Sequence, residues 1–413
     1  MPKPDFAAPS RSESFHFPRL TTRLNDRSHA MNPFYPTGRK ASCLLAGLCL
    51  AALSLAAGAE SIVTGGKTGT YFAIGNNLKD FVYPALEVKD SKGSWANVED
   101  MSQTKGVSLA IVQSDVYAAF VQLRDASDVP QATRSEYARL LANLRVVMPL
   151  YKEEIHFLVR KDDPIEFIHQ IKDKAIWMDA EKSGTYLTAL NIYSKLFQER
   201  PKSVEPFVNP TATGEDEGTR RRRSAIMALS DPAFYKAYPK IDVLVLVGGQ
   251  PLKLLEQNMP GNLKLLKFDP AHSASAKILQ DYQKADIKKA SYPLLNIAGN
   301  ESASLAVNSY LITANFADPK RNDFVKDFSA QLCSKFAVLQ EKGHSKWKDL
   351  TWQPGQSLPA LAAGWKYSDR SSEQLANCQK SQKTAAGGVS SSSGQLPAPS
   401  TCRPQDRVTG LCK

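Results

Sequence analysis

Short apolar runs alternate with helical segments between residues 60 and about 345, and this alternation restricts the possible fold more than any other feature. Residues 107–113 form a mostly apolar run, as expected of a strand that is buried on both faces. Residues 241–247 form a second strongly β-type run, which ends in two glycines. One further strand is expected to begin at Ile62. The other expected strands span residues 144–151, 155–160, 175–179, 263–268 and 303–312. Strands separated by helices predict parallel βαβ units and therefore an α/β sheet protein.

The first expected strand leads into a glycine-rich turn at residues 65–69, and a helix follows it. Glycines allow a ligand to approach the backbone closely, and the N–H groups at a helix N-terminus can receive an anion. The Gly-Lys-Thr within this turn is not a nucleotide P-loop, because that motif needs a glycine five positions before Gly66 and this chain has Ser61 there. The turn predicts either a cradle for a small ligand or an ordinary strand-to-helix connection without one.

Three further polar turns, at residues 90–94, 113–115 and 183–185, join expected strands to expected helices. Each turn alone has the residue types of an ordinary helix N-cap. In open α/β sheets, however, ligands bind outside the carboxyl ends of the strands. Four such turns together predict a polar pocket for a small anion or zwitterion.

The N-terminal region has the features of a secretory signal. A basic stretch that includes Arg39 and Lys40 precedes the apolar residues 41–55, and Ala57-Gly58-Ala59 predicts cleavage before Glu60. Leu48 before Cys49 argues against a lipoprotein signal. Residues 1–30 do not resemble the start of a signal peptide, so we expect either a start at Met31 or an N-terminal extension.

Four of the six cysteines lie beyond the expected signal peptide, at positions 333, 378, 402 and 412. An even number in an exported chain suggests disulfide bonds. Three pairings are possible, and we favour Cys333–Cys378 together with Cys402–Cys412. No cysteine has a metal-ligand spacing with a histidine, so we expect no metal site. Residues 380–400 are rich in Ser, Gly, Ala and Pro, and we expect residues 379–413 to form a disordered tail.

The formal charge is +11, and the first 59 residues carry seven Lys/Arg and three Asp/Glu, which leaves about +7 on the exported part. This charge suits an anionic small ligand, and no basic stripe interleaved with aromatic residues suggests nucleic acid. The run at residues 220–223 follows an acidic segment, and we favour a solvated helix face over a nucleic-acid or lipid patch.

Catalysis has little support in the sequence. The histidines at positions 156, 169, 272 and 344 belong to no hydrolase or metalloprotease motif. We expect His156 to be a buried core or hinge residue and the pair Glu153-Glu154 to be exposed. We therefore expect no catalytic residue, no cofactor and no enzyme activity.

The turns also resemble the TAXI group of solute-binding subunits of TRAP (tripartite ATP-independent periplasmic) transporters. The family's Gly-Gly-x-x-Gly-x-Tyr-Tyr opening corresponds to residues 65–72, with Phe72 in place of a tyrosine. Its Val-Gln-Ser-Asp strand end is present at residues 112–115, and three further motifs correspond to residues 89–97, 182–185 and 249–251. Lys92 and Lys182 replace usual glycines, and whether these lysines or Lys67 contact the solute is left open.

The resemblance implies a type II periplasmic-binding-protein fold, with two α/β lobes and a ligand cleft between them. Lobe one is expected at residues 60–160 and 300–378, and lobe two at residues 161–299. It also implies a monomer in the periplasm that delivers a small carboxylate-bearing solute, such as an amino acid, dicarboxylate or oxo-acid, to the TRAP membrane subunits. A protein that presents its ligand to an envelope sensor, and an exported enzyme on the same fold, are the alternatives.

On this basis we expect the carboxylate to be held by hydroxyl and N–H groups of the four turns, with one aromatic ring packed on the ligand. The ring is that of Tyr71. The expected ligand-binding residues are Gly66, Thr68, Tyr71, Ser94, Asn97, Gln113, Ser114, Ser183 and Thr185.

Overall fold

The computed structural model describes residues 60–378 except 128, 206–215, 232–239, 258–260 and 351. The expected signal peptide, the tail at 379–413 and the Cys402–Cys412 pair lie outside the described residues. The strands are β1 (Ser61–Val63), β2 (Glu87–Lys89), β3 (Val107–Gln113), β4 (Leu144–Arg160), β5 (Ala175–Trp177), β6 (Lys202–Ser203), β7 (Val243–Gly248), β8 (Leu263–Leu265), β9 (Gln283–Lys288) and β10 (Glu301–Ala314). The α-helices are α1 (Thr70–Asn77), α2 (Ser94–Gln103), α3 (Asp115–Asp125), α4 (Gln131–Asn143), α5 (Gly184–Phe197), α6 (Glu217–Ser230), α7 (Lys253–Gln257), α8 (Ser275–Ile278), α9 (Pro319–Lys342) and α10 (Asp369–Ala376). Short helical turns are η1 (Leu78–Val82), η2 (Ile168–Gln170), η3 (Lys289–Ser291) and η4 (Ser345–Trp347).

The strands of the described residues form one mixed sheet in the order β2-β1-β3-β10-β4-β7-β5-β6, with β8 paired to β4 and β9 to β10. The pairs at the two ends of the sheet are parallel, as the alternation of strands and helices predicted. The pairs in the middle are antiparallel, because β10 lies between β3 and β4 and runs opposite to both, and β4 also runs opposite to β7. The predicted parallel units are present at both ends of the sheet, and its antiparallel centre was not predicted.

Strand β4 is the longest strand and corrects an expectation. Residues 144–151 and 155–160 were expected as two strands, but Leu144–Arg160 is a single strand of 17 residues. Its ladder with β10 continues through the polar middle, where Asn308 pairs with Lys152 and Leu305 pairs with Ile155. The polar residues 152–154 do not interrupt the strand, because the partner strand supplies the backbone hydrogen bonds.

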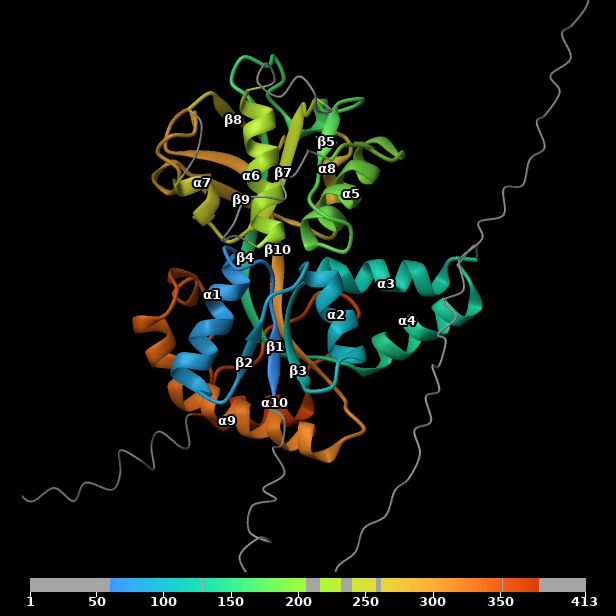
Figure 1. Cartoon of the computed structure of the whole chain (residues 1–413), viewed down its shortest axis with the longest axis vertical. Helices are drawn as coiled ribbons and strands as arrows, with labels where there is room; N and C mark the ends of the chain where they lie inside the picture. The colour runs from blue at the N-terminus through green and yellow to red at the C-terminus, as the bar shows by residue number, and fades with distance from the viewer. Residues whose placement is uncertain are drawn as a thin grey trace, which may run out of the picture. The chain divides into compact units, whose positions relative to one another are not determined.

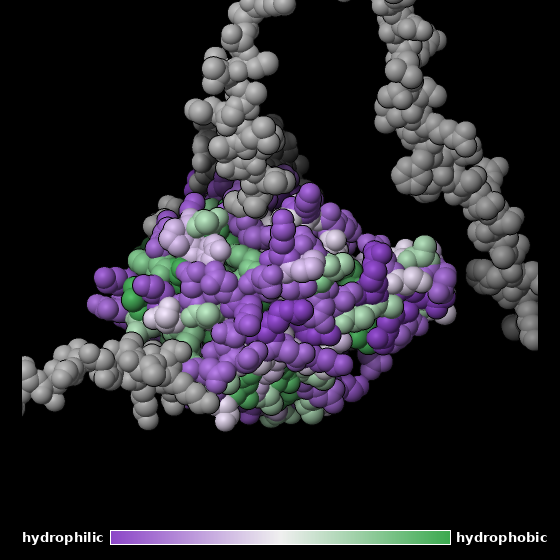
Figure 2. All heavy atoms as spheres, turned by 90° about the horizontal axis from the view of Figure 1, so that it is seen from below, coloured by the Kyte–Doolittle hydropathy of each residue, from purple (hydrophilic) through white to green (hydrophobic). Residues whose placement is uncertain are grey.

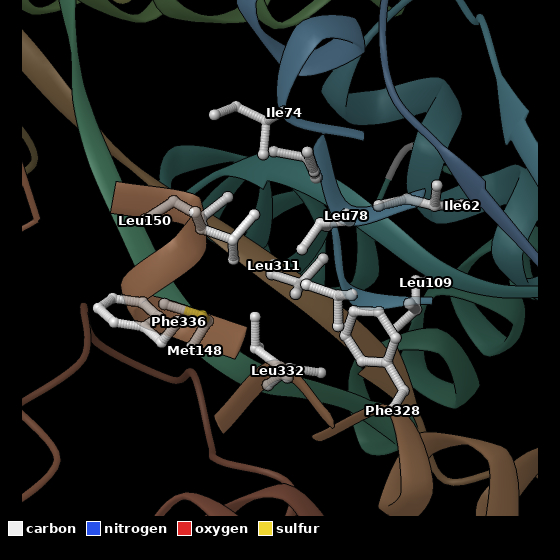
Figure 3. Close-up of a cluster of buried hydrophobic side chains, with 14 of the residues drawn as sticks. Ile62, Ile74, Leu78, Leu109, Met148, Leu150, Leu311, Phe328, Leu332 and Phe336 are labelled. Atoms are coloured by element: carbon white, nitrogen blue, oxygen red, sulfur yellow. The ribbon is translucent and has the colours of Figure 1, made fainter. Parts of the chain in front are cut away.

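Two groups of hydrophobic clusters define two lobes, which β4 and β10 share (Figure 1). In the lobe that contains α1 and α9, Met148 of β4 and Leu311 of β10 pack with Phe328 and Leu332 of α9 (Figure 3). In the lobe that contains α5 and α6, the same two strands contribute Ile155, Phe157, Leu305 and Val307 to the core. The predicted two-lobed α/β architecture is confirmed. The boundaries at residues 160 and 300 stay predictions.

The longest helix, α9, shows how the sequence specifies a lobe. Asp318 caps its N-terminus by accepting a hydrogen bond from the backbone N–H of Lys320 at 2.9 Å, and Pro319 occupies the first turn. Its buried residues recur every three or four positions, as an amphipathic helix requires. Cys333 of α9 forms a disulfide with Cys378, which confirms this predicted pairing.

The surface seen from the side of α9 is mostly hydrophilic, with apolar residues only in limited groups (Figure 2). No helix in the described part of the chain combines the length and apolar character needed to cross a bilayer.

Candidate ligand-binding site

A cavity of about 100 Å³ lies where the carboxyl ends of the strands of both lobes meet. Seven of the nine predicted ligand-binding residues line it: Gly66, Thr68, Tyr71, Ser94, Gln113, Ser183 and Thr185. The lining also includes residues that the sequence analysis did not select: Lys92, Glu153, Arg222, residues 246–248 and residues 252–254.

Three helices begin at the cavity. The first residues of α1, α2 and α5 (Thr70, Ser94 and Gly184) are all part of the lining. Each helix N-terminus has N–H groups without a partner inside the helix and carries the positive end of the helix dipole. Three converging N-termini make the cavity favourable for an anion.

Polar side chains of lobe one form a connected network on one wall of the cavity. The Tyr71 hydroxyl donates to Glu153 Oε2 at 3.1 Å and lies 3.5 Å from Ser94 Oγ. Ser94 Oγ in turn donates to Gln113 Oε1 at 3.3 Å and accepts from the Gln113 backbone N–H at 3.1 Å. The network fixes the orientation of these side chains before any ligand arrives.

Glu153 is the acid of this wall, and its position corrects an expectation. Glu153 and Glu154 were expected to be exposed, but their exposed fractions are 3% and 7%. Burial raises the pKa of Glu153 to about 8, and the nearby carboxylates of Asp115 and Glu154 add to the rise. The sequence did contain a signal for this burial, because the acidic pair lies between two apolar strand segments. It was interpreted as an exposed connection because two strands were expected where a single strand continues.

Arg222 of α6 supplies a cation from lobe two. Its Nε donates to Asp179 Oδ2 at 2.8 Å, and the Asp179 side chain is 3% exposed. A Cβ atom at Gly66 would lie only 3.1 Å from Arg222 Nη1, so the glycine makes room for the guanidinium. The interpretation of residues 220–223 as a solvated helix face is therefore wrong for Arg222.

Two predicted site residues lie outside the lining, although both are close to it in the sequence. The Asn97 side chain bonds to the backbone carbonyls of Thr64 and Ile111, the latter at 2.7 Å. The backbone carbonyl of Ser114 accepts from Trp365 Nε1 at 2.9 Å, and the backbone N–H of Ser114 donates to a carbonyl of β10. Both residues hold the strand ends in place.

Of the three lysines left open by the sequence, Lys92 lines the cavity. Lys67 and Lys182 do not line it. Lys67 is exposed, and Lys182 donates to Glu99 Oε2 at 2.9 Å at the surface.

Several hydrogen bonds join the two lobes around the cavity. Thr68 of the opening turn bonds to Thr219 of α6 at 2.8 Å. Asp115 of α3 accepts from the hydroxyls of Thr188 and Tyr282 at 2.7 and 2.9 Å. Burial raises the pKa of Asp115 to about 6. The lobes are therefore in direct contact over the cavity.

His156 is a core residue, as predicted. It is fully buried, with Nδ1 3.0 Å from the Glu154 carbonyl oxygen and Nε2 3.0 Å from the Tyr292 hydroxyl. Burial lowers its pKa to about 4. Among the described residues, no group of three His, Cys, Asp or Glu side chains is placed to hold a metal ion.

Comparison with known proteins gives one family and several distant structures. A family model described as the NMT1-like family matches residues 62–216, which is less than half of the chain. The structure of a periplasmic transporter is 11% identical, with a TM-score of 0.39 over 79% of this chain and 94% of that one. The substrate-binding protein of an amino acid ABC transporter is 13% identical, with a TM-score of 0.35 over 70% of this chain and all of its own.

A third structure is a periplasmic sulfonate-binding protein from Methylobacillus flagellatus KT. It is 11% identical, with a TM-score of 0.36 over 68% of this chain and 69% of its own. The fold class of this chain follows from its own sheet topology, and such distant likenesses carry no argument about its ligand.

Proposed function

We propose that this chain is an exported solute-binding protein that captures a small carboxylate-bearing solute between its two lobes. The observation that carries the proposal is the cavity at which three helix N-termini and Arg222 converge. These groups offer N–H donors and positive charge to a carboxylate, and contacts from both lobes allow the solute to favour a closed state.

The transport route belongs to the same proposal. The motifs at residues 65–72 and 112–115 resemble those of TRAP solute-binding subunits, so the closed protein would act in the periplasm as a monomer and dock on TRAP membrane subunits. Recovery of these subunits with the protein from cross-linked cell envelopes supports this route. Recovery of a sensor protein instead supports the alternative of ligand presentation.

A thermal-shift screen tests solute capture directly. We expect one or more amino acids, dicarboxylates or oxo-acids to raise the melting temperature, because a ligand at 1,000 times its Kd stabilises the native state by about 4 kcal/mol. Neutral sugars of similar size are the control and should have no effect. A screen in which no carboxylate raises the melting temperature contradicts the proposal.

An exported enzyme is the second candidate, and one observation favours it. Glu153 lines the cavity, and its pKa is raised to about 8. Catalytic general acids and bases commonly have a pKa that is shifted toward neutral pH in this way. NMR of each stabilising solute after prolonged incubation separates the two functions. A binding protein returns the solute unchanged, whereas turnover that is lost in Glu153→Gln establishes the enzyme.

A further inference from the structure

Glu153 and Glu154 are adjacent buried acids with opposite surroundings. Glu154 pairs with Lys346 Nζ at 3.1 Å and also accepts from the Gln250 backbone N–H at 2.8 Å. Within the described part of the chain, no cation pairs with Glu153, which instead accepts from the Tyr71 hydroxyl. A buried carboxyl without a cation is more stable as the neutral acid.

Building on the proposed function, we propose that Glu153 remains protonated in the complex and donates a hydrogen bond to the solute, so that the cavity selects acceptor groups over ammonium groups at this position. A carboxylate or keto oxygen suits such a donor. An ammonium group at the same place has only donors and would require Glu153 to lose its proton first.

Burial and the nearby carboxylates of Asp115 and Glu154 favour the neutral form of Glu153, and they outweigh the hydrogen bonds with Tyr71 and Gln113, which favour the ionised form. The titratable residues that face it are Tyr71 of α1, Asp115 of α3, and Tyr151 and Glu154 of β4. Burial raises the pKa of both tyrosines well above the ordinary value, so they stay neutral.

The remaining lining charges also favour an anionic solute. The described lining contains the cations Lys92, Arg222 and Lys253, and Glu153 is its one acidic residue. With Glu153 neutral, the cavity offers a proton donor at one wall and cations elsewhere. This is the arrangement expected for an acid without an amino group, such as an oxo-acid or dicarboxylate.

The proposal predicts how affinity depends on pH. Because the pKa of Glu153 in the free protein is about 8, its proton is present at pH 7 and mostly lost at pH 9. A solute that requires this proton should therefore bind about tenfold more weakly at pH 9 than at pH 7. A solute whose ammonium group pairs with ionised Glu153 should show the opposite trend.

The test is calorimetric titration at pH 7 and pH 9 with two matched pairs of probes, 2-oxoglutarate against L-glutamate and pyruvate against L-alanine. We expect the oxo-acid of a pair to bind at least tenfold more tightly, and we expect Glu153→Gln to lose the pH dependence, because an amide donates at both pH values. Glu87→Gln, an exposed acid of β2 on the same lobe, is the matched control and should keep the wild-type dependence. The proposal is overturned if the amino acid of a pair binds more tightly than its oxo-acid, or if Glu153→Gln keeps the pH dependence of the wild type. Either result still shows that the protein captures a solute.

A second measurement needs no ligand. Carbon-13 NMR of the Glu side-chain carboxyls, assigned by comparison with Glu153→Gln, reports the protonation of Glu153 in the free protein. A resonance of the protonated form at pH 7 supports the proposal, and an ionised Glu153 at pH 7 overturns it. If Glu153 is protonated but none of the probes binds, the result contradicts solute capture and not the protonation of Glu153.

Discussion

At the scale of single residues, Arg222 and Glu153 give the cavity its chemical character. Arg222 brings a guanidinium cation, and Asp179 fixes its orientation. Glu153 brings a carboxyl whose proton is retained near neutral pH. The hydroxyls of Ser183 and Thr185 have structural partners as well, since Ser183 caps α5 and Thr185 accepts from the Val247 N–H at 3.3 Å.

The first residue-scale prediction concerns Arg222→Gln. A hydrogen bond to a charged partner contributes about 1.5–3 kcal/mol, so loss of the guanidinium should weaken carboxylate binding by roughly 10- to 150-fold. The variant should also melt at a lower temperature, because buried Asp179 loses its cation. Calorimetric titration and thermal melting measure the two effects.

Arg223→Gln is the matched control, since Arg223 is the next residue of α6 and is exposed. It should bind the same solute with an affinity close to that of the wild type. Equal weakening in both variants would indicate a general charge effect and would contradict a direct role for Arg222.

The sequence predicted the residues of the strand-end turns, because turn chemistry is local. Gly66, Thr68, Ser94 and Ser183 follow from glycine and hydroxyl patterns next to strands. Arg222 could not be predicted in this way. Its guanidinium lies beside Gly66, which is more than 150 residues away in the sequence, and only the folded chain brings the two segments together.

At the scale of elements, β4 connects the cavity to both cores. The strand contributes Met148 to the core of lobe one, Glu153 to the cavity and Phe157 to the core of lobe two. Its length and its pairing with β10, which continues on both sides of the register shifts near Ser309 and Ile312, place the buried acids at the crossing between the lobes.

The disulfide between α9 and Cys378 gives an element-scale prediction. In the chain-entropy model, a bond that closes a loop of 45 residues stabilises the fold by about 4 kcal/mol. The double variant Cys333→Ser, Cys378→Ser should therefore melt at a clearly lower temperature. A reducing agent should lower the melting temperature of the wild type to that of the double variant, and it should leave the melting temperature of the double variant unchanged. A double variant with the wild-type melting temperature would show that the bond contributes nothing.

The sequence predicted the long and apolar elements well. The bounds of β3 are the predicted ones, and α5 begins at the predicted Ser183 turn. The strands β2, β6 and β9 were not predicted, because they are short and polar and much of their surface is exposed. Such strands form because a neighbouring strand offers free backbone hydrogen-bonding groups at its edge. Their own residues show little of the sequence pattern that is typical of a strand.

At the scale of the whole molecule, contact between the lobes depends on buried acids. Asp115 of lobe one accepts two hydrogen bonds from lobe two while its pKa is raised to about 6 by burial. The folded state therefore binds more protons than the unfolded state between about pH 4 and pH 6, and its stability falls as the pH rises through this range.

Asp115→Asn tests this linkage. The amide oxygen can still accept from Thr188 and Tyr282, but it does not titrate. The variant should gain stability relative to the wild type by on the order of 2 kcal/mol between pH 4 and pH 7. Denaturant unfolding across this range measures the difference. A difference that does not change with pH would show that Asp115 is not desolvated in solution.

The two-lobed α/β architecture could be predicted from the sequence, but the mixed topology of the sheet could not. The order of strands and helices along the chain predicts parallel units at the two ends of the sheet. The antiparallel centre arises because β10 returns from the far end of the chain and inserts between β3 and β4. Nothing local in residues 301–314 encodes that insertion.

The most direct test of a solute held between the lobes is calorimetry on Gly184→Ala, with the tightest carboxylate from the thermal-shift screen. A Cβ at Gly184 would lie 1.6 Å from Gln113 Oε1 and 2.8 Å from Ser94 Oγ of the other lobe, so with the lobes closed the methyl group should displace both side chains from the cavity wall, where they hydrogen-bond to each other. Gly261→Ala is the control, because its Cβ would make only ordinary contact. We predict that Gly184→Ala loses affinity by at least about 100-fold, or roughly 3 kcal/mol, while Gly261→Ala binds like the wild type. Wild-type affinity in Gly184→Ala would contradict binding between the lobes.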